Sequence, residues 1–154
     1  LAKKGNWEAC LSMAKKALAS GAAWGKFRQM CAAQGGDAAV LDQPQKLYEK
    51  AQVYELTAPQ DGWVERMDAE RCGRASMLLG AGRETKDSVI DPAAGIVLCR
   101  KTGEAVQKGQ TLAWLYTNRP DQLEQARRTL LESYVFSAKK PAEIPLIYDR
   151  ILEK

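Results

Sequence analysis

The stretch from Leu79 to Asp91 reads LGAGRETKDSVID and gathers residues that could do chemistry. Gly80 and Gly82 stand directly before Arg83, and glycines beside a basic residue can form a loop that cradles phosphate. The dinucleotide fingerprint, however, requires a third glycine where Thr85 stands, followed by a helical pattern that is not found here. The Walker motif requires Gly-Lys-Ser/Thr, which is also missing from this stretch. The sequence therefore favours a tight glycine turn over a phosphate loop.

Lys86 suggests a second kind of chemistry, a covalently carried cofactor. The segment GEAVQKGQTLAWL, which begins at Gly103, has the hairpin pattern of biotinyl and lipoyl carrier domains. A lipoyl domain presents its lysine after an acidic residue, whereas Lys86 precedes Asp87, and the flanking methionines of a biotinyl domain are missing. We therefore interpret Lys86 as a solvated loop lysine. A free-standing biotinyl- or lipoyl-like carrier, or a structural module, remains the alternative.

The sequence contains no histidine, which excludes a Ser-His-Asp triad and other histidine-based acid–base chemistry within these residues. Four cysteines are widely separated and form no C-x-x-C pair, namely Cys10, Cys31, Cys72 and Cys99. This spacing does not predict a metal site. We expect reduced thiols in a cytoplasmic protein.

The composition is that of a globular protein, with 45% apolar and 27% charged residues among 154. The net charge is +4, and lysines and arginines are scattered among acidic residues instead of forming a basic run. This pattern predicts neither a nucleic-acid partner nor a membrane partner. The chain opens at Leu1 instead of a methionine, in a helical context, from which we expect a longer protein.

Residues 1–50 carry helical signals, and we assign them to a first domain. Asn6 fits an N-cap because apolar residues follow it at helical spacing. These apolar residues are Trp7, Leu11, Ala14 and Leu18. Gly21 stands where a glycine would end that helix, and a second helix is predicted to end at the pair Gly35-Gly36.

Residues 51–154 change to a pattern of short strands, and we assign them to a second domain. Strand patterns flank polar turns in VYELTAPQDGWVERM and again in GIVLCRKTGEAVQKGQTLAWLYTN, with turns predicted at 101–103 and 108–109. Punctuating glycines, which include Gly73, favour a small flattened barrel of the carrier type, a barrel-sandwich hybrid.

A final helix is predicted to begin at a cap formed by Asp121. Its apolar face would carry Leu123, Ala126, Leu130 and Tyr134. The expected fold class is thus α+β, with N-terminal helices, a β module and a C-terminal helix.

Several of these stretches, in this order, resemble one enzyme family. The segment ALASGAAWGKFRQMCAAQGGD (17–37) is similar to a helix pair in pyrimidine-nucleoside phosphorylases and thymidine phosphorylases. Three further segments resemble the C-terminal domain of that family, namely APQDGWVERMDA (58–69), LGAGRETKDSVIDPAAGIVLCRKTGEAVQKGQTLAWLYTN (79–118) and IPLIYDRI (144–151). The ordered blocks L-G-A-G-R, I-D-x-A-x-G-I and G-x-x-V-x-K-G make the resemblance specific, and it extends over nearly the whole chain.

This resemblance implies the last third of an enzyme that cleaves pyrimidine nucleosides to free base and (deoxy)ribose-1-phosphate. Inorganic phosphate would be the co-substrate, and no cofactor is implied. Residues 1–50 would be the end of the α/β phosphate-binding domain, and residues 51–154 the C-terminal module. The phosphate and base sites of the family lie upstream, so we expect no catalytic, substrate-binding or metal-ligating residue here and an inactive isolated fragment. The implied partners are the rest of the same chain and a second copy in a homodimer.

The resemblance also gives the stretch at 79–91 a third interpretation. Gly80 and Gly82 would allow a tight turn, and Arg83 and Lys86 would lie at the cleft and assist its closure. A loop that only stabilises the fold or the subunit is the alternative.

Overall fold

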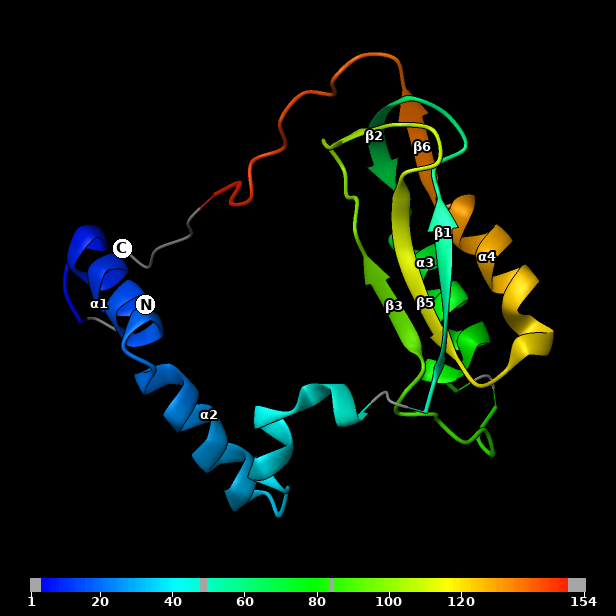
Figure 1. Ribbon diagram of the computed structural model, residues 1–154. Helices are drawn as coiled ribbons and strands as arrows, with labels where there is room; N and C mark the ends of the chain where they lie inside the picture. Colours follow the sequence, from blue (N-terminus) through cyan, green and yellow to red (C-terminus); the bar gives the residue numbers. More distant parts are fainter. Residues whose placement is uncertain (1–3, 48–49, 84, 150–154) are drawn as a thin grey trace. The chain divides into compact units, whose positions relative to one another are not determined.

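The computed structural model describes residues 4–47, 50–83 and 85–149 (Figure 1). The chain is α+β and forms two compact units, Leu1–Leu47 and Tyr48–Lys154. None of the helices in these described ranges is long and apolar enough to cross a membrane.

The first unit is helical. It contains α1 (Trp7–Ala19), α2 (Ala22–Ala33) and the short 3-10 elements η1 (Ala38–Asp42) and η2 (Pro44–Leu47). The Asn6 carboxamide oxygen accepts a hydrogen bond from the backbone N–H of Ala9 at 2.9 Å, which confirms the predicted N-cap. Gly21 at φ 75° separates the two helices, and Gly35 at φ 80° follows the second, so both predicted helix ends are confirmed.

The first unit has no hydrophobic core among its described residues. None of residues 4–46 is buried, and large apolar side chains on both long helices are exposed. These are Trp7, Leu11, Met13, Leu18, Trp24, Phe27 and Met30. One ion pair, between Arg28 and Asp42, joins α2 to η1. The unit is thus defined by local capping and short-range contacts and not by burial.

The second unit contains two antiparallel sheets of three strands each. One sheet has the order β1-β5-β3 and the other β4-β2-β6. The strands are β1 (Gln52–Thr57), β2 (Gly62–Met67), β3 (Gly95–Leu98), β4 (Ala105–Val106), β5 (Thr111–Thr117) and β6 (Tyr134–Ser137). The predicted turns are confirmed by Gly103 at φ 90° and Gly109 at φ 83°.

The predicted flattened barrel is not closed within the described residues, where the two sheets remain separate. Strand and turn patterns report local pairing, whereas closure depends on how the edge strands of the two sheets meet, so this part of the prediction was too specific.

Two helices that flank the strands differ from the predictions. The α3 helix (Ala69–Ser76) lies where punctuated strands were expected, and Gly73 is inside it. The C-terminal helix is shorter than predicted: η4 (Pro120–Gln122) precedes α4 (Leu123–Leu131), and no side chain caps α4. Asp121 lies within η4, and Tyr134 begins β6, where it pairs with Met67, because the helix has ended at Leu131.

The core belongs to the second unit and draws on both sheets, α3 and α4. Its buried members are Leu56, Ala58, Val64, Ala75, Leu79, Val106, Leu112, Ala113, Leu115, Leu123, Ala126, Leu130 and Tyr134. The two helices lie side by side (Figure 1). Leu123, Ala126 and Leu130 follow the helical period, so the predicted apolar face of α4 is confirmed except at Tyr134.

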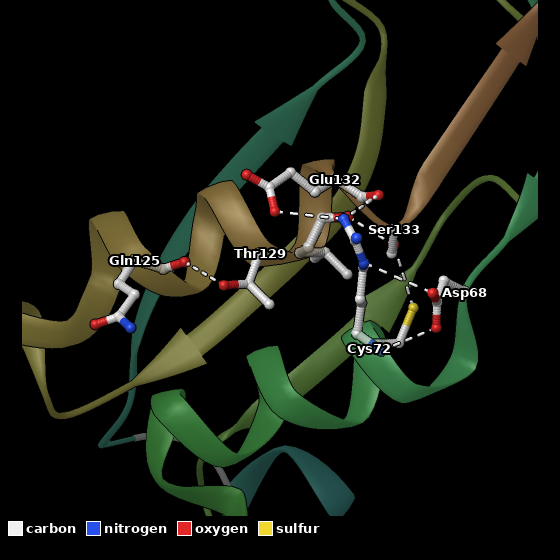
Figure 2. A network of polar contacts seen from close by, with 8 residues as sticks. Asp68, Cys72, Gln125, Thr129, Glu132 and Ser133 are labelled. Atoms are coloured by element: carbon white, nitrogen blue, oxygen red, sulfur yellow. Dashed lines mark hydrogen bonds and ion pairs between the residues drawn. The ribbon is translucent and has the colours of Figure 1, made fainter.

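A polar network joins the start of α3 to the end of α4 (Figure 2). The Asp68 carboxylate caps α3 by accepting from the N–H of Arg71 at 3.2 Å, and the Asp68 N–H donates to the Ser133 carbonyl at 2.9 Å. The Cys72 thiol donates to the Ser133 hydroxyl at 3.3 Å, and the Arg71 guanidinium donates to the Glu132 carbonyl at 3.2 Å. These contacts fix the point at which the chain leaves α4 and enters β6.

Candidate functional site

The glycine-rich stretch begins as a buried turn at the end of α3. The element η3 (Met77–Ala81) contains Gly80, whose φ is 110°, a conformation that favours glycine. The Gly80 carbonyl accepts a hydrogen bond from the N–H of Asp91 at 2.9 Å. A Cβ on Gly80 would lie 3.4 Å from Nε of Arg119 and 3.5 Å from Cβ of Ala94. The predicted tight turn is therefore present at Gly80, and it closes the base of the stretch.

Gly82 serves a different purpose from Gly80. Its φ is −140°, which is extended backbone open to any residue. A Cβ there would lie 3.2 Å from Cβ and 3.3 Å from Cγ of Met77. The positive-φ turn predicted for both glycines is thus found only at Gly80, while Gly82 permits a close approach to the preceding helical turn.

The last residue of β5 and the two residues after it anchor both ends of this stretch. The Thr117 hydroxyl, which is fully buried, donates to the Leu79 carbonyl at 2.7 Å. The Asn118 carboxamide donates to the Asp91 carboxylate at 2.8 Å, and the Arg119 guanidinium donates to the Val89 carbonyl at 3.1 Å. Sequence reasoning missed residues 117–119 because they lie far from the loop along the chain. The polar run T-N-R directly after an apolar strand was the available signal.

We define the 83–91 loop as residues 83–91, of which Glu84 lies outside the described residues. The side chains of Arg83 and Lys86 are exposed, and neither forms an ion pair within the described ranges. The structure does not bring these two cations to a common partner. A local turn connects Thr85 and Ser88, where the Thr85 N–H donates to the Ser88 hydroxyl at 2.9 Å.

A hollow of about 280 Å³ follows the loop at the start of β3. Its lining is mostly apolar and consists of Pro92, Ala93, Ala94, Gly95, Ile96, Val97 and Tyr116. Within the described residues no group of three histidine, cysteine, aspartate or glutamate side chains could hold a metal ion. The arrangement offers two exposed cations and an apolar hollow, which suit contact with another surface and not proton transfer.

The titration of Tyr134 is shifted within the core. Burial raises the pKa of the Tyr134 phenol well above its usual range, and the nearby Cys72, Cys99 and Glu104 add to the shift. The hydroxyl donates one bifurcated hydrogen bond, shared between the Arg100 carbonyl at 3.1 Å and the Leu112 carbonyl at 3.3 Å. Tyr134 therefore stays neutral at ordinary pH and joins both sheets to the β3–β4 connection.

The position of Lys86 bears on the carrier alternative. Lys86 lies in the short turn between Thr85 and Ser88, in a loop that joins η3 to β3. A swinging lysine would require a hairpin with a strand on each side, and the described residues before this turn form η3 instead. The loop thus lacks the support that a carrier lysine needs.

Comparison with known proteins identifies one family. Residues 63–137 match the model of the pyrimidine nucleoside phosphorylase C-terminal domain. A pyrimidine-nucleoside phosphorylase of Geobacillus stearothermophilus is 44% identical over 150 residues, which are 97% of this chain and 34% of that protein. The corresponding protein of Staphylococcus aureus (strain MSSA476) is 38% identical over 138 residues, which are 90% of this chain and 31% of that protein. The protein of Bacillus subtilis (strain 168) is 42% identical over 105 residues, which are 68% of this chain and 24% of that protein. The chain therefore spans at most about a third of the length of these curated relatives.

Proposed function

Because residues 63–137 belong to the pyrimidine nucleoside phosphorylase C-terminal domain family, we propose that the chain is the C-terminal third of such an enzyme. The observation that carries the proposal is the alignment of 97% of this chain, at 44% identity, with about a third of the Geobacillus stearothermophilus phosphorylase. The complete enzyme would cleave a pyrimidine nucleoside with inorganic phosphate and release the base and (deoxy)ribose-1-phosphate.

The chemistry in this proposal is a phosphate attack on C1′ of the sugar while the glycosidic bond breaks. The transition state has the character of an oxocarbenium ion, so the protein contributes positioning and charge stabilisation. The groups that would hold phosphate and base lie in the preceding part of the enzyme. The isolated fragment would therefore be inactive.

The first unit supports a role as the end of a larger domain. Both of its long helices expose apolar side chains, for example Leu18 at 74% and Phe27 at 42%. Exposed large apolar side chains on both helices suit contact with another surface. The partner in our proposal is the α/β domain of the same chain, and the complete enzyme would be a homodimer in the cytoplasm. Four free cysteines accord with a reducing compartment.

The 83–91 loop would assist closure of the cleft between domains. Its support is the combination of a fixed base at Gly80 with the exposed cations Arg83 and Lys86 and the exposed apolar residues Val89 and Ile90. A loop held at its base and exposed at Arg83 and Lys86 can meet an opposing domain without rearranging the core.

The test of this role uses the longer phosphorylase chain that contains these residues. Replacement of both Arg83 and Lys86 by Ala should lower kcat for phosphorolysis of uridine by roughly three- to tenfold, the loss expected from one or two exposed charge contacts. Replacement of Lys101 and Lys108, exposed cations in other turns of the same unit, is the matched control. Unchanged kcat and KM in the loop variant would leave the loop a purely structural role.

The carrier alternative has a separate test. The chain is incubated with biotin ligase and biotin, or with lipoate ligase and lipoate, and its intact mass is measured. A mass gain that disappears in Lys86→Arg would establish the carrier function and overturn the phosphorylase proposal for this loop. We expect no gain.

A further inference from the structure

The 83–91 loop has no core of its own. Val89 is 78% and Ile90 44% exposed, so neither apolar side chain anchors it by burial. Within the described part of the loop, the internal hydrogen bonds are confined to Thr85 and Ser88. The position of the loop must therefore depend on polar contacts with other segments.

Residues 117–119 supply those contacts. The Thr117 hydroxyl both donates to the Leu79 carbonyl and accepts from the N–H of Arg119 at 2.9 Å. Because Thr117 ends β5 and is fully buried, this double contact fixes the backbone from which Arg119 projects. Asn118 meanwhile holds Asp91, whose second carboxylate oxygen accepts from the N–H of Ala93 at 2.9 Å.

Arg119 reaches furthest along the loop of these three residues. Its half-buried side chain passes over Gly80, where an added Cβ would lie 3.4 Å from Nε, and then donates to the Val89 carbonyl. No carboxylate within the described ranges lies within ion-pair distance of Arg119. Among the described residues, the guanidinium is oriented by its hydrogen bond to the Val89 carbonyl and by its close approach to Gly80.

We propose that Arg119 is a positioning residue that holds the 83–91 loop in its closure-competent place, by its hydrogen bond to the Val89 carbonyl across Gly80. This inference rests on the proposed function. In this proposal Arg119 acts through its contact with the loop and not on the reacting groups. Its loss should free the loop without opening the core, since Arg119 lies outside the buried set.

The structural half of the proposal is tested by amide hydrogen exchange on the 154-residue chain. Arg119→Met keeps the apolar stem and removes the donor, and it should speed exchange at the amides of Asp91, Ala93 and Ala94 about three- to tenfold, as expected for one lost hydrogen bond. Arg119→Lys keeps a donor and should restore most of the protection. Arg127→Met is the matched control, because Arg127 is also half-buried but forms an ion pair with Glu124 on its own helix. Exchange unchanged in Arg119→Met would overturn the proposal.

The functional half uses the longer phosphorylase chain, with uridine and inorganic phosphate as substrates. Arg119→Met should lower kcat about three- to tenfold and leave KM for phosphate within about twofold, because the loop acts in closure and not in ground-state binding. Arg119→Lys should recover most of kcat, and Arg127→Met should match the parent. If Arg119→Met only destabilised the fold, it would lower the melting temperature of the second unit and would not lower kcat selectively while leaving KM for phosphate unchanged.

The exchange and kinetic experiments give different results if this inference fails and if the proposed function fails. Faster loop exchange with unchanged kcat in an active parent would overturn the positioning role alone. A parent without phosphorolysis would overturn the proposed function and the kinetic half with it. The exchange experiment on the 154-residue chain would still decide whether Arg119 holds the loop.

Discussion

The two units of this chain are both regular, but only one is built around a core. Residues 4–46 form two helices without a buried residue, whereas the second unit buries side chains from both sheets, α3, η3 and α4. Helices of 13 and 12 residues are marginal in water without tertiary contacts. The difference teaches that local signals define the first unit, while long-range packing defines the second.

The first and largest test of this comparison separates the units. Residues 50–154 alone should keep a cooperative thermal transition, and residues 1–47 alone should show little helix by far-UV circular dichroism. The reason is that the core lies entirely in the second unit. Full helicity of α1 and α2 in the isolated 1–47 peptide would contradict the comparison.

Truncation of one leucine in each unit sharpens the comparison between the two units. Leu130→Ala removes a fully buried side chain from the core and should lower the free energy of unfolding by about 2–5 kcal/mol. Leu11→Ala removes a side chain that is 41% exposed and should change it by less than about 0.5 kcal/mol. Urea unfolding of the 154-residue chain measures both. Similar losses in the two variants would show that α1 is packed in solution.

Two glycines with positive φ allow a finer comparison. Gly80→Ala must strain a buried turn beside Arg119 and should cost about 1–3 kcal/mol of unfolding free energy. Gly21 has φ 75° but nothing within 4 Å of an added Cβ, so Gly21→Ala should affect only local helix content. Urea melts followed by tryptophan fluorescence report the first effect, and circular dichroism reports the second. A Gly80→Ala variant with parental stability would remove the structural reason for this glycine.

The smallest effect concerns pH. The raised pKa of Tyr134 means that the folded state retains the phenolic proton above pH about 10, where an unfolded tyrosine loses it. The unfolded state then binds fewer protons, so this contribution to stability is fully present below pH about 10 and declines above it. Tyr134→Phe should lose roughly 1 kcal/mol at pH 8 through its missing hydrogen bonds and show a shallower alkaline decline than the parent. Parallel pH profiles from pH 8 to 11 would contradict this assignment.

Local chemistry was predictable from the sequence, and long-range contact was not. The cap at Asn6, the helix stops at Gly21 and Gly35 and the hairpin turns at Gly103 and Gly109 each depend on a few neighbouring residues, and all are present. The α3 helix was missed because Gly73 reads as a breaker, although Asp68 before Ala69-Glu70 was a usable N-cap signal.

The candidate site shows the same division. The loop and its turn at Gly80 could be identified from sequence, because a glycine-bounded polar segment is a local pattern. Its anchors could not, since Thr117, Asn118 and Arg119 lie at the end of a different strand and meet the loop only in the folded unit. The sequence also did not predict that the two sheets remain separate, because strand patterns do not specify whether a barrel closes.

The central claim is that the second unit is self-sufficient while the first is completed by another part of a phosphorylase. Amide hydrogen exchange, compared between the 154-residue chain and the longer phosphorylase chain that we propose contains it, tests this most directly. The account predicts protection of the core strand β5 in both, and protection of α1 and α2 only in the longer chain. Equal protection of α1 and α2 in the two chains would contradict it.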